Sequence, residues 1–302
     1  MKHTMFVLLL GGIASVITVP LVAAFFAQTK RDDSGELRER DEIRQTFKLA
    51  PGTRVEVSSI RGPVEIETAD IEVAEVHIVR SAQSRADLGE FKIGIENKPQ
   101  SLVIAGETRQ RNSGSGFGPD VRHHVMLRLP RRIDLSVRSV SGQVRIGDVD
   151  GQIMVSSVSG SFSIGTVDGQ LQLSSVSGSV DIGQVKQQAE IKSASGNVTI
   201  GQVMGSLDVS SVSGTLSAGI SKLGERGVRI NSVSGQVELR FTGELNAQLS
   251  TDSISGKVSI EVPNVTMQSS PNAAATRALI GKGGPPISIK GVSKGVRLAQ
   301  GT

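Results

Sequence analysis

A four-residue motif, Ser-x-Ser-Gly, occurs seven times between residues 139 and 256, and its regular spacing limits the possible folds more than any other feature. The first five copies follow one another every 18 residues, and the last two follow at 21 residues each. The first serines of the copies are Ser139, Ser157, Ser175, Ser193, Ser211, Ser232 and Ser253, and the glycines are Gly142, Gly160, Gly178, Gly196, Gly214, Gly235 and Gly256. Repetition at a fixed period indicates a chain built from stacked structural units, and we interpret the serines and glycines as a structural turn.

Apolar residues alternate with polar residues inside each repeat. Val140, Val144 and Ile146 share one parity in the first copy, and Val158 and Val176 take the place of Val140 in the next two. Because every second side chain of a strand lies on one face, this pattern predicts that these apolar residues form a core. The residues between them are predicted to face water, namely Gln143, Arg145, Ser161, Ser163, Gln170 and Gln172.

A single 18-residue unit cannot bury its own apolar face, whereas stacked units share one interior. The predicted fold class is therefore all-β: a parallel β-solenoid, or β-helix, with coils of 18–21 residues, preceded by an N-terminal hydrophobic helix. The segment from Ile60 to Ile66 matches the spacing around Gly142, so we expect coiling to begin near residue 53. At the C-terminus Val296 and Leu298 keep the alternation, and we expect the irregular last coil to close the stack.

The N-terminus carries no charge from Met5 to Gln28, a stretch long enough to cross a bilayer as a helix of about 20 residues. We favour an uncleaved membrane anchor, and Val22-Ala23-Ala24 keeps a cleaved signal peptide open. We predict a protein of the cell membrane, single-pass or exported, with its repeats on the periplasmic or extracellular side. Lys2 favours a cytoplasmic N-terminus and Lys30 the reverse, so the orientation stays open.

These boundaries divide the chain into five segments. They are a membrane anchor or signal segment at 1–28, a polar linker at 29–45, irregular β coils at 46–135, regular solenoid repeats at 136–262, and a loop with a closing coil at 263–302.

The composition argues against several classes of site. The chain has no cysteine, which excludes disulfides, cysteine-ligated zinc and thiol nucleophiles. Its net charge is +4, but the positive residues are scattered and no Trp or Tyr is present to stack on bases, so we predict no nucleic-acid binding.

No group of residues marks a reaction centre, so we predict no catalytic residues, no metal and no cofactor. The histidines are His3, His77, His123 and His124, and none lies in the repeats. Adjacent histidines on a strand point to opposite faces, which is wrong for a shared metal. The acidic residues of the repeats are scattered singly, whereas a glycosidase needs two positioned carboxyl groups.

The tandem Ser-Val-Ser-Gly-x-Val-x-Ile units behind a hydrophobic N-terminus resemble a bacterial family of unknown function that is named for a proposed role in adhesion. The resemblance covers about residues 46–302, including an entry strand at Met126–Pro130 and a closing turn at Ile280–Gly284. It implies a solenoid fold and brings no catalytic residues with it.

We therefore expect a non-enzymatic cell-envelope protein that presents its coils as an adhesion or binding surface. A structural or sensory spacer that works with a membrane partner is the alternative, and a polysaccharide-active enzyme ranks third. The expected partners are an envelope protein or surface polymer, the membrane through residues 5–28, and a second copy through the coil ends.

Overall fold

The computed structural model describes residues 39–108, 121–252, 254–268, 275–292 and 294–301. The chain divides into two compact units, Met1–Gly35 and Glu36–Thr302, and the described residues belong to the second. The predicted N-terminal helix and Ser253 lie outside the described residues, and for Ser232 only the backbone is described. No helix in the described ranges is long and apolar enough to cross a membrane.

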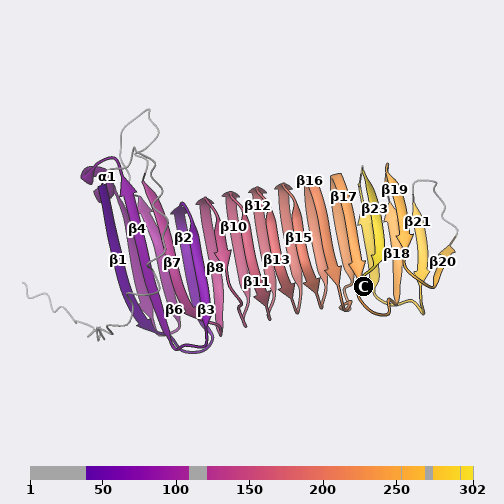
Figure 1. The fold of residues 1–302 in the computed structure, drawn as a ribbon, viewed down its shortest axis with the longest axis horizontal. Coiled ribbons are helices and arrows are strands. Elements are labelled where there is room, and N and C mark those ends of the chain that lie inside the picture. Colours follow the sequence, from indigo (N-terminus) through magenta and orange to yellow (C-terminus); the bar gives the residue numbers. More distant parts are fainter. Residues whose placement is uncertain (1–38, 109–120, 253, 269–274, 293, 302) are drawn as a thin grey trace, which may run out of the picture. The chain divides into compact units, whose positions relative to one another are not determined.

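The described part of the chain is all-β, as predicted. Its 23 strands form one mostly parallel sheet, and its helix is α1 (Arg85–Glu90), which Ser84 caps by accepting a hydrogen bond from the Asp87 amide. Figure 1 shows the repeat strands side by side from β8 to β17. The backbone pairings resolve into two ladders, which the long strands β16 and β17 join.

Ladder A contains the strand that precedes each Ser-x-Ser-Gly corner. In spatial order its strands are β5 (Phe91–Lys98), β6 (Ser101–Thr108), β2 (Thr53–Arg61), β8 (Ile133–Ser141), β10 (Ile153–Ser159), β12 (Leu171–Ser177), β14 (Ala189–Ser195), β16 (Leu207–Ile220), β17 (Val228–Phe241), β22 (Pro286–Lys290), β18 (Ala247–Asp252), β21 (Thr276–Ile280) and β20 (Val265–Gln268).

Ladder B contains the strand that follows each corner. Its order is β1 (Glu39–Lys48), β4 (Val73–Ala82), β7 (Arg122–Pro130), β3 (Val64–Ala69), β9 (Val144–Ile146), β11 (Phe162–Val167), β13 (Val180–Val185), β15 (Val198–Val203), the second halves of β16 and β17, β23 (Gly295–Gln300) and β19 (Lys257–Glu261).

The repeat length appears directly in the strand register. Ile153 pairs with Leu171 in ladder A, and Phe162 pairs with Val180 in ladder B, each 18 residues on. Leu207 pairs with Val228, which is the 21-residue step. The inward side chains of both ladders belong to one continuous hydrophobic core. This arrangement fits a solenoid, because each unit buries its apolar face only against its neighbours.

The alternation predicts most side-chain directions correctly and fails at the corner. The six polar residues predicted to face water, from Gln143 to Gln172, are all exposed. The valines of the motif, however, also point outward: Val140, Val158 and Val176 are 41%, 57% and 55% exposed.

The backbone at the corner explains this error. Ser157, not Val158, continues the inward set of Ile153 and Val155, and the next inward residue is Phe162. The interval of five residues is odd, so the inward parity changes across Gly160. A period of two holds only within a strand, and the turn resets it.

The corner serines and glycines have distinct backbone roles. The buried hydroxyls of Ser157, Ser175 and Ser193 each donate to the carbonyl oxygen two residues on, at 3.2 Å. The equivalent bonds of Ser139 and Ser211 measure 3.2 and 3.3 Å. Positive φ values occur at six of the seven predicted glycines, namely Gly142, Gly160, Gly178, Gly196, Gly214 and Gly235. Gly256 is the exception and lies against Lys294.

The stack begins where the sequence predicts, but its first neighbour in space is distant in the chain. β2 and β3 pair in parallel with β8 and β9, so Val55 lies beside Leu135 and Val64 beside Val144. An extra residue, Ser59 at φ 58°, lets buried Ile60 occupy the position opposite Ser139. The paired residues of these strands are 80 positions apart in the sequence. Of the strands between them in the chain, β6 pairs with the other edge of β2, and β7 with the other edge of β3.

Part of the predicted polar linker is a strand instead. Residues 39–45 open β1, which pairs antiparallel with β4 across its whole length. Ile43 and Phe47 pack against the core, and Asp41 forms an ion pair with Arg80. The charged residues that suggested a linker thus occupy the outward face and the ion pairs of an edge strand.

The C-terminal coil does not close the stack as predicted. Ile287 in β22 pairs with Val228 on one side and Leu249 on the other, so β22 lies between β17 and β18. Likewise β23 lies between β17 and β19. The last coil of the chain therefore has both edges hydrogen-bonded, and the earlier strands β18 to β21 form the end of the stack.

We predict that the corner glycines limit stability through close backbone approach. Gly178 has φ 127°, and a Cβ added there would collide with the Gly160 carbonyl oxygen. Gly178→Ala should therefore destabilise the protein by more than about 3 kcal/mol, since strained φ and steric overlap add.

The matched control is Gly243→Ala, because Gly243 has φ 96° but no atom within 4 Å of an added Cβ. It should cost only about 1–2 kcal/mol. Urea unfolding of both full-length variants, followed by circular dichroism, measures the difference. Equal losses would show that stacking does not constrain the corner.

Candidate functional site

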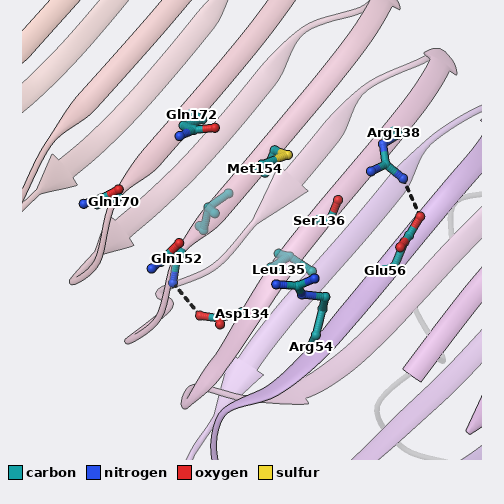
Figure 2. A pocket seen from close by; sticks show the side chains of 11 residues that line it. Arg54, Glu56, Asp134, Leu135, Ser136, Arg138, Gln152, Met154, Gln170 and Gln172 are labelled. Carbon is teal, nitrogen blue, oxygen red and sulfur yellow. Dashed lines mark hydrogen bonds and ion pairs between the residues drawn. The ribbon is translucent and has the colours of Figure 1, made fainter. Parts of the chain in front are cut away.

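A shallow groove lies on the outward face of ladder A, where the first coil meets the regular repeats. Its volume is about 190 Å³. Four neighbouring strands and the residues just before two of them line it, and Figure 2 shows their outward side chains. They are Arg54 and Glu56 of β2, Asp134, Ser136 and Arg138 of β8, Met154 of β10 and Gln172 of β12, together with Gln152 and Gln170, which directly precede β10 and β12.

Strand alternation positions these residues. Val55, Leu135, Ile153 and Leu171 point into the core and are almost completely buried. Their neighbours in sequence must then point outward, and the in-register pairing aligns them in columns. Arg54 lies beside Asp134, which lies beside Gln152, and the same order continues to Gln170. The groove is therefore a direct product of register.

Two charged interactions hold one side of the groove. Arg138 forms an ion pair with Glu56, and an Asp134 carboxylate oxygen accepts a hydrogen bond from the backbone amide of Gln152 at 3.0 Å (Figure 2). The Arg54 side chain is exposed, and its guanidinium has no ion pair or hydrogen bond with any described residue. It is therefore the charged side chain of the groove whose guanidinium is available to a ligand.

Several neutral polar groups in the groove are also without partners among the described residues. The Ser136 hydroxyl is enclosed and makes no hydrogen bond. The side-chain amides of Gln152, Gln170 and Gln172 are exposed and make none either. Met154, half exposed at 49%, supplies an apolar surface among them.

Further along the same face, some polar side chains are paired with one another, whereas others, such as those of Asn231 and Gln248, are exposed without a described partner. Lys192 contacts Glu190 at 2.7 Å, and Arg229 contacts Asp208 at 3.2 Å. Gln188 accepts a hydrogen bond from Arg226 at 2.9 Å. The groove thus gathers one guanidinium and three side-chain amides without described partners, and it can bind a polar ligand at its surface.

The histidines lie away from the groove, on β4 and β7. His77 is buried, and its Nε2 lies 3.4 Å from a Glu42 carboxylate oxygen. His123 is also buried, and neither of its ring nitrogens has a hydrogen-bond partner. Burial, together with the nearby Arg80 and Arg61 charges, lowers the pKa of His123 to about 4. Within the described ranges, no three His, Cys, Asp or Glu side chains gather as metal ligands would.

The site residues predicted from the sequence lie at the corner, and none of them lines the groove. The predicted serines and glycines lie at the C-terminal ends of the ladder A strands, whereas the groove lies toward their N-terminal ends. The periodic glutamines Gln152 and Gln170 could have marked it. Arg54 and Glu56 could not, because they are 80 residues from the strand they join.

The model of the family Toastrack DUF4097 matches residues 53–294, which is most of the chain. The chain belongs to this family. All of the groove residues of this Toastrack protein, from Arg54 to Gln172, lie inside the matched region.

Solved structures also resemble this Toastrack chain. A proposed adhesin from Bacteroides fragilis is 12% identical, with a TM-score of 0.41, and the match covers 86% of this chain and 96% of the other. A proposed adhesin from Parabacteroides distasonis is 13% identical, with a TM-score of 0.37 and coverage of 86% and 97%. A proposed lipid-binding protein from Parabacteroides distasonis is 8% identical, with a TM-score of 0.26 and coverage of 87% and 97%. No curated protein matches the chain.

We predict that acid destabilises the protein through His123. The unfolded chain takes up a proton near the ordinary pKa of 6.5, whereas the folded protein does so only near 4. The unfolded state thus binds more protons between these values, so stability is full above pH 6.5 and falls as the pH drops toward 4. The loss should approach about 3 kcal/mol.

His123→Leu should flatten this part of the pH profile, measured by urea unfolding at a series of pH values. His124→Gln is the control, because His124 lies on the outward face of the same strand and is partly exposed. An unchanged slope in His123→Leu would contradict the assignment.

Proposed function

We propose that this protein is a non-enzymatic cell-envelope binding protein, whose stacked coils form a parallel β-solenoid that presents an adhesion surface. The supporting observation is that one groove brings together the Arg54 guanidinium and the side-chain amides of Gln152, Gln170 and Gln172, none of which has a partner among the described residues. Exposed donors and acceptors without protein partners can form hydrogen bonds with a ligand, and each such bond contributes about 0.5–1.5 kcal/mol. The paired strands fix the spacing of the backbone positions that carry these groups, which favours binding.

The groove's carboxylates support binding over catalysis. Glu56 is held by Arg138, and Asp134 accepts a backbone hydrogen bond. A glycosidase needs one carboxylic acid that donates a proton and a second carboxylate that acts on the sugar. Both groove carboxylates already have partners within the protein, so they do not form the free pair that this chemistry requires.

A second reading has a specific observation in its favour. Val140, Val158 and Val176 form an exposed aliphatic column at the corner, and such a surface suits contact with a protein. The protein would then act as a structural or sensory spacer with an envelope partner.

One binding experiment compares the two surfaces. The full chain is tested against a panel of bacterial surface polymers and against detergent-solubilised envelope proteins. Gln152→Ala combined with Gln172→Ala should weaken polymer binding by about tenfold, since each lost hydrogen bond is worth about 0.5–1.5 kcal/mol. Val158→Ser combined with Val176→Ser is the matched control, and it should leave polymer binding unchanged. If the glutamine variant bound polymers like the wild type, and only the valine variant lost binding to an envelope protein, the groove proposal would be overturned in favour of the spacer.

We also propose that residues 5–28 attach the protein to the membrane, because this stretch is uncharged and long enough to span it. After expression in a bacterium, the full chain should stay in the membrane fraction during alkaline carbonate extraction. Release by carbonate with a mature N-terminus near Phe25 would instead indicate a cleaved signal peptide.

A further inference from the structure

We propose that the groove recognises polysaccharides whose sugar rings carry carboxylate groups, and that Arg54 binds the carboxylate. This inference rests on the proposed binding function and adds the chemical class of the ligand. Four features of the groove carry it: a guanidinium without a partner, several neutral hydrogen-bonding groups, an apolar side chain and the periodicity of the coils.

Arg54 provides the charge selectivity. Its guanidinium is exposed and makes no ion pair with a described residue, whereas Arg138 is already engaged by Glu56. A guanidinium offers paired N–H donors that match the two oxygens of a carboxylate. The groove contains two arginines and two acids, so its formal charges cancel and the attraction is local to Arg54.

The acidic residues nearby do not oppose this assignment. Glu56 is neutralised by its contact with Arg138. One carboxylate oxygen of Asp134 accepts a hydrogen bond from the backbone amide of Gln152 at 3.0 Å. Both carboxylates are thus turned toward partners within the protein, which leaves the guanidinium of Arg54 as the group available to an anion.

The neutral groups suit sugar hydroxyls. A glutamine side chain both donates and accepts, as a hydroxyl group requires of its partner. Gln152, Gln170 and Gln172 provide three such amides, all of them exposed. Met154 lies among them and offers a polarisable surface for the C–H face of a ring.

The coil spacing suits a chain of sugars. Strands of neighbouring coils lie about 4.8 Å apart, which is close to the length of one pyranose residue in an extended chain. A polysaccharide running along the column of Arg54, Asp134, Gln152 and Gln170 would therefore place about one ring over each coil. A polymer binding weakly at each ring gains affinity from repeated contacts.

The strand pairing disfavours an extended peptide as the ligand. β2, β8, β10 and β12 are each hydrogen-bonded to strands on both sides. No backbone edge in the groove is therefore available for the strand addition by which extended peptides commonly bind. Recognition has to come from side chains on the face of the sheet.

The test uses polygalacturonate and its methyl ester, which share their rings and differ in the free carboxylate. Binding of the full chain to each immobilised polymer is measured at low and high salt. The wild type should prefer the free acid by about tenfold or more, and salt should reduce that preference, because the contact is charge-assisted and solvent-exposed. Arg54→Gln should remove the preference while retaining binding to the ester.

Arg229→Gln is the matched control, since Arg229 is an exposed arginine on the same face outside the groove. It should bind like the wild type. Poly-glutamate, which has carboxylates but no rings, should bind at least about tenfold more weakly than polygalacturonate, because it leaves the amides without hydroxyl partners.

The outcomes separate the ligand class from the general proposal. Equal binding of acid and ester, or a preference that survives in Arg54→Gln, would overturn the carboxylate assignment and leave the binding function standing. Equal binding of poly-glutamate would overturn recognition of the ring. If neither sugar polymer bound while a different surface polymer still depended on Gln152 and Gln172, this ligand class would be wrong and the proposed function would remain.

Discussion

Parallel backbone hydrogen bonding between residues one repeat apart is the constraint on which the rest of this structure depends. The amide of Ile153 donates to Gln170, and that of Leu171 donates to Gln188, each at 2.9 Å. Such bonds place equivalent residues of successive repeats directly beside one another. The residues at each position of the repeat therefore form a column along the stack. Neighbouring residues in a column must fit beside each other at the distance between adjacent strands. Glycine at the corner is the clearest case, because a Cβ at Gly160 or Gly178 would meet the carbonyl of the preceding copy.

The same constraint builds the outer face. Outward side chains of ladder A form columns along the stack, and their chemistry can change from one coil to the next, as from Met154 to Gln172 to Glu190. The groove lies at the junction of the first coil with the regular repeats. Arg54 and Glu56 continue columns that consist of Asp134, Gln152 and Gln170 or of Ser136 and Met154. The junction brings charged and neutral groups together without providing each with a partner.

Three of the four ladder ends follow a different rule, whereas the fourth, at β19, keeps its parallel pairing with β23. Coils can pair in parallel only while another coil is present, and an uncovered end would expose backbone groups and apolar core. At the N-terminal end β1, β4 and β7 pair antiparallel, and β5 pairs antiparallel with β6. At the other end β21 pairs antiparallel with β18 and β20. The switch in direction ends the repeat, and the charged residues of β1, such as Asp41, form ion pairs there instead of a flexible linker.

The sequence by itself determined the length of the coils, the class of fold and the direction of most side chains, because period and alternation are properties of the local backbone. It also located the first coil, since the residues around Gly62 repeat the corner spacing. Only the tertiary structure decided the direction of Val158, because the parity across a turn depends on its φ and ψ angles and not on the alternation of the flanking strands. Only the tertiary structure placed β22 between β17 and β18, and β2 beside β8. Coils of similar sequence present the same backbone donors and acceptors at their edges, so the local sequence pattern does not determine which coil lies beside which. The groove depends on that choice, which is why its glutamines were visible in the sequence and the partnership with Arg54 was not.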